Sequence, residues 1–102
     1  TLYPLLCFGG HGNCAVSGNV VPDVMRDIFR NYENGAKDKA RDLHYKYYTL
    51  FEMLRAETNP IAVKQTLNLM GLPGGRLRPP LTELSEAKKE KLKKVLRDRN
   101  LI

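Results

Sequence analysis

The sequence has little of what marks secreted or membrane proteins. It has no tryptophan and two cysteines, too few for a disulfide scaffold, so a reducing compartment is favoured. No stretch approaches the roughly 20 uninterrupted apolar residues that a membrane helix requires, so we expect no membrane partner. The N-terminal residues also lack the basic region of a secretory signal. These absences predict a cytoplasmic protein.

The first 22 residues carry no Asp, Glu, Lys or Arg. A charge-free run is typical of an element that is covered on both faces, as in a parallel sheet. Within this run we expect one strand, at about residues 13–17. One strand cannot satisfy its own backbone donors and acceptors, so the 102 residues are predicted to be part of a larger fold.

The remainder is predicted to be helical, because apolar residues recur at intervals of three and four. The expected helices cover residues 22–34, 37–56, 59–71 and 85–98. Proline and capping residues mark their starts and glycines their ends, at Pro22, Asn34-Gly35, Asn59-Pro60, Gly71 and Ser85. The expected buried stripes are Val24, Met25, Ile28, Phe29 and Tyr32; Ala40, Leu43, Tyr47, Leu50, Phe51 and Leu54; Ile61, Val63, Leu67 and Met70; and Leu92, Val95 and Leu96. Residues 72–81, rich in proline and glycine, are expected to form an ordered loop or extended strap.

The net charge of +6 is concentrated near the C-terminus. The last predicted helix and its end hold seven basic residues: Lys88, Lys89, Lys91, Lys93, Lys94, Arg97 and Arg99. Such a helix could bind phosphates, but no aromatic residue interleaves the lysines and no zinc-finger or RNA-binding motif accompanies them. A solvated face with a Glu90–Lys94 pair is the simpler interpretation, and we expect no nucleic-acid partner.

Three motifs carry a family resemblance that spans the whole chain. GGHGNCAVSGNVVP, at residues 9–22, resembles the eighth barrel strand and following loop of the dihydrodipicolinate synthase/N-acetylneuraminate lyase family. ETNPIAVKQTLNLMGLPGG and LRPPLTELSEAKKEKLKKVLRDRNLI resemble that family's C-terminal helical extension. The order and spacing of these blocks match, and the resemblance is closest to the dihydrodipicolinate synthase branch.

The resemblance implies an α/β fold of which this chain is only a part. Residues 1–35 would form the last strand and helix of a (β/α)8 TIM barrel, and residues 36–102 a three-helix C-terminal extension. As an isolated chain it would be mostly helical. A whole barrel needs about 250 residues, so the strands that carry the family's reactive lysine and its tyrosine are not expected here.

The implied activity is that of a lyase that forms a Schiff base between a lysine and pyruvate. In the synthase branch the second substrate is aspartate semialdehyde and the product is 4-hydroxy-tetrahydrodipicolinate, on the route to diaminopimelate and lysine. No cofactor is implied. The partners implied are pyruvate, an aldehyde, the remainder of the barrel and further copies in a tetramer. This portion alone would be inactive. The alternatives are another aldolase of the family, acting on N-acetylneuraminate or a keto-deoxy sugar acid, and a stand-alone helical protein-interaction module.

One family site carries over to this sequence, and it contains no catalytic side chain. The register of GGHG implies that Cys14 contributes its backbone to the pyruvate carboxylate pocket, where the family more often has a branched aliphatic residue. Ser17 and Asn19 would line or brace the site. Gly18 replaces a small alkyl residue, so no side-chain contact is expected from it.

Other interpretations of the N-terminal motif are less favoured. A small buried hydrophobe is a commoner role for Cys14 than a reactive thiol. Cys7, His11 and Cys14 have a spacing unlike that of zinc sites, so no metal is expected. Gly9, Gly10 and Gly12 precede the predicted strand, which is the wrong context for a phosphate loop. A tight helix-to-strand turn is their expected role.

Several polar residues in the helical part invite functional interpretations that we consider weaker than structural ones. Tyr45, Tyr47 and Tyr48 would point to different faces and serve in packing and interface contact. Lys64 is expected to be an ion-pair partner, for Glu57, and not a Schiff-base lysine. Arg76 and Arg78 would fasten the strap to the barrel or to a neighbouring subunit.

Overall fold

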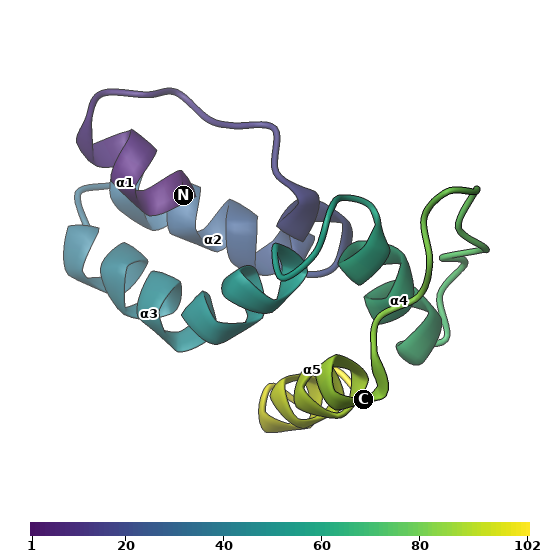
Figure 1. The fold of residues 1–102 in the computed structure, drawn as a ribbon. Helices are drawn as coiled ribbons and strands as arrows, with labels where there is room; N and C mark the ends of the chain where they lie inside the picture. Colours follow the sequence, from purple (N-terminus) through teal and green to yellow (C-terminus); the bar gives the residue numbers. More distant parts are fainter. The chain divides into compact units, whose positions relative to one another are not determined.

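The computed structural model describes residues 1–102 and divides the chain into two compact units, residues 1–48 and 49–102. Its elements in chain order are the helix α1 (Leu2–Cys7), the 3-10 helix η1 (Val16–Asn19), α2 (Pro22–Glu33), α3 (Lys37–Leu54), α4 (Ile61–Leu69) and α5 (Glu86–Asp98), shown in Figure 1. α3 continues through the boundary between the units. There is no strand, and no helix is both long and apolar enough to cross a membrane.

The first unit begins with a helix that the sequence analysis did not predict. The charge-free run folds as α1 and packs alongside α2 (Figure 1). Leu2 and Leu6 are buried on α1, and Val24 and Ile28 are buried on α2. The first part of the run, residues 2–7, is therefore helical, with apolar residues four apart that face a neighbouring helix.

The strand predicted at about residues 13–17 is absent, and this prediction is wrong. Residues 11–15 have no regular structure, and η1 begins at Val16. Ala15 retains extended dihedrals, with φ −127° and ψ 132°. An extended segment becomes a strand only when a neighbour completes its hydrogen bonds, and no other part of this chain is extended beside it.

The ends of α2 agree with the prediction. Pro22 is the first residue of α2, where its missing N–H leaves no intrahelical bond unmade. Gly35, with φ +81°, follows the last turn, and the Ala36 amide donates to the Asn31 carbonyl at 2.8 Å. α3 starts at Lys37 as predicted and ends two residues earlier than predicted, at Leu54.

The later helix ends agree in part. α4 begins one residue after the Pro60 predicted as its first helical position, because Pro60 takes the cap position predicted for Asn59 and Ile61 is the first helical residue. Gly71, at φ +74°, ends it as predicted. The Ser85 hydroxyl accepts a hydrogen bond from the Lys88 amide at 3.4 Å, which confirms Ser85 as the cap of α5.

Buried side chains of the second unit come from every element in it. Leu50, Leu92 and Leu96 are fully buried, as their periodicity predicts. Thr66 is also fully buried although it is polar, because its hydroxyl donates to the Ala62 carbonyl at 2.8 Å within α4. Three members of the predicted stripes of α4 and α5, Leu67, Met70 and Val95, are half-buried.

The segment 72–81, which we call the strap, is ordered and runs back along α4 (Figure 1). The Asn68 side-chain amide donates to the Gly75 carbonyl at 3.0 Å, and the Lys64 ammonium donates to the Arg76 carbonyl at 2.7 Å. Gly74 is buried between these two contacts. The strap predicted from proline and glycine content is therefore held directly against a helix.

Candidate functional site

The glycine-rich motif closes α1. The Gly9 amide donates to the Leu6 carbonyl at 3.0 Å, and the Gly10 amide donates to the Leu5 carbonyl at 2.8 Å. Gly9 has φ +87°, and a Cβ on Gly10 would lie 2.9 Å from the Leu5 oxygen. The motif therefore forms a tight turn after a helix, as predicted, and no strand follows it.

Cys14 lies beyond this turn and is exposed, as is Cys7, and neither forms a disulfide. The sequence analysis favoured a buried Cys14, so that expectation is wrong for this structure. The charge-free sequence indicated burial, but burial also requires a covering surface, and residues 11–14 are exposed although the Asn13 side-chain amide lies 3.4 Å from the Thr1 hydroxyl. Ala15, the next residue, has extended dihedrals and precedes η1.

The two polar residues predicted to line or brace the site are both held by local hydrogen bonds. The Ser17 hydroxyl lies 3.3 Å from the Met25 sulfur, in the geometry of a weak O–H···S hydrogen bond. The Asn19 side-chain amide donates to the Val16 carbonyl at 3.2 Å, inside η1. Ser17 and Asn19 therefore brace the segment before α2 through local contacts, and this describes their positions better than direct lining of a site.

A cavity of about 220 Å³ opens beside Cys14. Its walls come from the two neighbours of Cys14 (Asn13 and Ala15), from Gly18 and from the α2 side chains of Met25 and Phe29. Met25 and Phe29 were predicted as core residues, and no pattern in the sequence indicated their second role. The cavity is mostly apolar and offers backbone groups instead of catalytic side chains, which suits holding a small molecule and not transforming it.

A cluster of rings around His44 in the first unit was also not foreseen. His44 is 9% exposed, and its ring lies 5.6–5.7 Å from those of Tyr3, Tyr45 and Tyr48. Tyr45 and Tyr48 contact His44 by their edges and remain 67% and 46% exposed. The tyrosines thus combine packing with an exposed surface, although two of them share His44 and do not point to separate faces.

Burial, followed by the positive charge of the N-terminal amino group, lowers the pKa of His44. Above about pH 6.5 the histidine is neutral in both the folded and the unfolded chain. As the pH falls below that value, the unfolded chain gains a proton that the folded chain resists. We therefore expect the thermal midpoint to fall between pH 7 and pH 5.5 by calorimetry.

Two variants check this expectation. His44→Phe keeps an aromatic ring in the cluster and removes the titration, so its midpoint should change less over the same interval. His11→Asn removes the other histidine, which is exposed, and should keep the pH dependence of the parent chain. A pH dependence that persists in His44→Phe would contradict the assignment.

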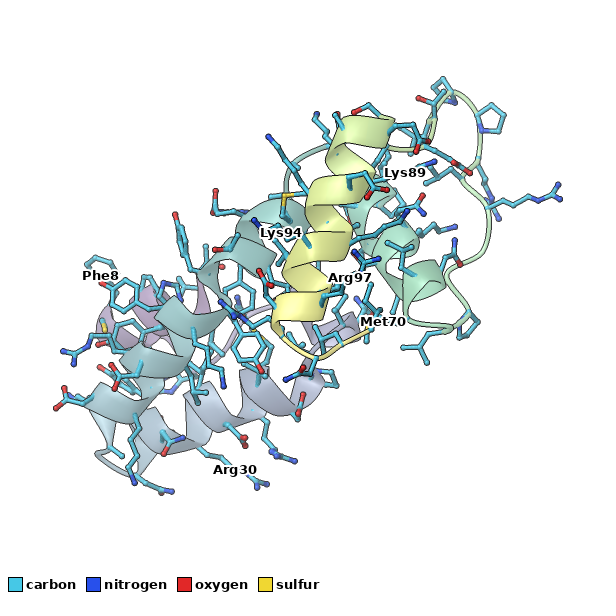
Figure 2. The ribbon with its side chains drawn as sticks, turned by 90° about the horizontal axis from the view of Figure 1, so that it is seen from below. Phe8, Arg30, Met70, Lys89, Lys94 and Arg97 are labelled. Atoms are coloured by element: carbon cyan, nitrogen blue, oxygen red, sulfur yellow. The ribbon has the colours of Figure 1, made fainter.

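Three of the six basic residues of α5 form ion pairs within the second unit. Lys88 pairs with Glu57 across the unit, and Lys89 contacts Glu83 at 2.8 Å. Lys93 pairs with Glu90 at 2.8 Å, so the expected Glu90–Lys94 pair is replaced by one at a spacing of three. Figure 2 shows the remaining charges, including those of Lys94 and Arg97, projecting from α5. The solvated face predicted from the sequence is therefore exposed and carries local ion pairs beside charges that form none.

The expected ion pair between Lys64 and Glu57 is not formed, and this prediction is wrong. Glu57 pairs with Lys88, while Lys64 donates to the Arg76 backbone carbonyl. The Arg76 and Arg78 side chains are exposed and fasten nothing in this chain, because the strap is held through its backbone.

Residues 1–99 match the dihydrodipicolinate synthetase family. The chain belongs to this family. Among its relatives, the 4-hydroxy-tetrahydrodipicolinate synthase of Archaeoglobus fulgidus is 44% identical over 97% of this chain, and that of Methanocaldococcus jannaschii is 43% identical over the same share. The chain spans 34% of the length of each. It corresponds to the C-terminal portion of a dihydrodipicolinate synthase.

Solved structures of this family superimpose closely on the chain. Dihydrodipicolinate synthase from Thermotoga maritima is 42% identical with a TM-score of 0.94, over 99% of this chain and 34% of that one. The Acinetobacter baumannii enzyme, in complex with pyruvate, is 34% identical with a TM-score of 0.90, over 98% and 34%. The predicted fold class is confirmed, since this helical chain matches part of a TIM-barrel dihydrodipicolinate synthase.

Proposed function

We propose that this chain is the C-terminal part of a lyase that condenses pyruvate with aspartate semialdehyde to form 4-hydroxy-tetrahydrodipicolinate. The observation that carries the proposal is the family match over residues 1–99, together with a relative 44% identical over 97% of the chain. The structural relative that holds pyruvate supports the choice of the first substrate. Residues 1–35 would complete the barrel, and residues 36–102 would form its helical extension.

In this proposal Cys14 supplies a backbone contact to the pyruvate carboxylate. The irregular segment at residues 13–15, extended at Ala15, and the cavity beside it support this role. Neutral backbone dipoles can orient a carboxylate without a charged side chain nearby. The Schiff-base lysine and the proton-relay tyrosine belong to strand motifs that this chain does not contain. This chain would therefore help to bind pyruvate and to shape its pocket. The reaction itself would need the remainder of the barrel.

The test joins this chain to the missing portion. The first two thirds of the Archaeoglobus fulgidus synthase, which precede the matched region, are co-expressed with it, and pyruvate and borohydride are added to the purified pair. We expect mass spectrometry to find one reduced pyruvate adduct on the added polypeptide and an unchanged mass for this chain, alone or paired. An adduct on Lys64 or on any other lysine of this chain would contradict the proposal.

The same pair tests the role of Cys14. Carbonyl-labelled cysteine gives two backbone signals, one from Cys7 and one from Cys14, because the chain has no other cysteine. Pyruvate should shift the Cys14 signal and leave that of Cys7 in place as an internal control. If neither signal moves although the adduct forms, Cys14 does not contribute to the pocket.

One observation favours a second function, that of a helical interaction module. Phe8 is 91% exposed and projects from the end of α1 (Figure 2), and Leu5 on the same helix is 40% exposed. Neighbouring exposed apolar side chains can form part of a contact surface when they belong to a contiguous patch. In the lyase proposal this surface meets the rest of the barrel or another copy in a tetramer. If the chain melts cooperatively, self-associates and does not bind the added portion of the synthase, the interaction-module function is favoured instead.

A further inference from the structure

A second cavity lies within the second unit, between α4 and the strap. Its volume is about 460 Å³, within the range of small-molecule sites. Lys64 and Asn68 line it from α4, Arg76 and Leu77 line it from the strap, and residues 81–83 close it before α5. None of the residues that the family resemblance singled out as pyruvate-binding lies here.

The walls of this cavity are fixed by contacts that do not use its open face. Asn68 holds the Gly75 carbonyl at 3.0 Å, and Lys64 holds the Arg76 carbonyl at 2.7 Å. Gly74 seats the strap closely on α4, because a Cβ there would lie 2.6 Å from the Asn68 side-chain oxygen. The strap is thus preorganised, which reduces the entropic cost of binding.

The charge balance of the cavity is positive. Its one carboxylate, that of Glu83, is held by Lys89 at 2.8 Å, and this hydrogen bond together with the lysine charge lowers the pKa of Glu83. Figure 2 shows Lys89 on the side of α5 nearest the strap. The ion pairs of the chain include neither Lys64 nor Arg76. Two cationic residues therefore line the cavity without a carboxylate partner, and the Lys64 ammonium contacts the Arg76 carbonyl.

The remaining walls select among anions. Leu77 and Leu81 give the cavity an apolar side, and Thr82 and Asn68 offer neutral polar groups. A guanidinium presents paired N–H donors that match a carboxylate, and an ammonium adds a point charge. A hydrated inorganic anion would use the cations and leave the leucines without a contact.

We propose that the cavity between α4 and the strap binds a small aliphatic carboxylate, with its charged end at Lys64 and Arg76 and its carbon chain against Leu77 and Leu81. This proposal does not depend on the lyase function, because every lining residue lies between positions 64 and 83. The site would fill or remain empty whether or not the barrel is completed.

The test is a titration of the full chain, labelled with ¹⁵N, with sodium butyrate at constant ionic strength. We expect saturable shifts of the amide signals of residues 64–68, 75–77 and 81–83. Butyramide has the same shape without the charge and should give no saturable shift. Arg76→Gln removes one charge-assisted contact and should raise the dissociation constant about tenfold.

Arg78→Gln is the matched control, because Arg78 is an exposed arginine of the same strap that does not line the cavity. It should bind butyrate as the parent chain does. Unchanged Gly74 and Gly75 signals in Arg76→Gln would show that the strap is intact, since the variant retains the carbonyl that Lys64 contacts. Linear shifts, equal responses to butyramide, or equal affinities of the two variants would each overturn the proposal.

Discussion

Leu92→Ala is expected to cost about 2–5 kcal/mol of unfolding free energy, the range for truncating a fully buried leucine. Leu92 is 0% exposed and lies at the middle of α5 in the second unit. The truncation removes buried methyl groups and leaves a cavity that neighbouring side chains fill only in part. A domain of this size has a total stability of about 5–15 kcal/mol, so the loss is a large fraction of the whole.

Urea denaturation followed by circular dichroism measures this loss. Leu72→Ala is the matched control, because Leu72 is 45% exposed, and its cost should stay within about 0.5 kcal/mol. Equal midpoints for the two variants would mean that α5 does not contribute to a shared core. A urea midpoint of Leu92→Ala equal to that of the parent chain would lead to the same conclusion about α5.

Gly74→Ala is the second substitution for which we expect a large effect, about 1–3 kcal/mol of destabilisation, as found when a close-packed site is overfilled. The added Cβ would meet the Lys64 carbonyl and lie 2.6 Å from the Asn68 side-chain oxygen. The Lys64 carbonyl belongs to the backbone of α4, so the strap has to move instead. That movement would break the hydrogen bond between Asn68 and Gly75.

Denaturation and the Gly75 amide signal together measure the effect of Gly74→Ala. Gly18→Ala serves as the control, since a Cβ on Gly18 meets nothing within 4 Å and its backbone is not left-handed. We expect Gly18→Ala to remain within about 0.5 kcal/mol of the parent chain. If Gly74→Ala is as stable as this control, the strap does not pack as closely as described.

The four longer helices could be predicted from the sequence because their signals are local. Pro22, Gly35, Gly71 and Ser85 act within one turn of the chain, and apolar spacing of three and four gave the buried faces of α2 to α5. α1 could not be recognised in the same way. Its six residues include no charged side chain to mark a solvent face, so a helix and a covered strand leave the same pattern.

The errors arise where the structure depends on distant partners. A strand at residues 13–17 requires neighbouring strands, which the local sequence does not describe. The partner of Lys64 was missed because a long side chain can reach a backbone carbonyl as readily as a carboxylate. His44 lies within a correctly predicted helix, yet its burial comes from Tyr3 on another one. The place of Cys14 in a pyruvate pocket stays a prediction from the family resemblance.

The way the strap is fastened bears on how this region can diverge. Both side chains that hold it, Lys64 and Asn68, belong to α4, and both acceptors are main-chain oxygens that any amino acid supplies. Gly74 must remain small for steric reasons, and Gly75, at φ +72°, has a backbone conformation that favours glycine. Substitutions at the exposed positions 76 and 78 can therefore accumulate at little cost to the architecture. Lys64, Asn68 and Gly74 thus maintain the fold of this region, while the exposed side chains of the strap are free to change and to bind a new ligand.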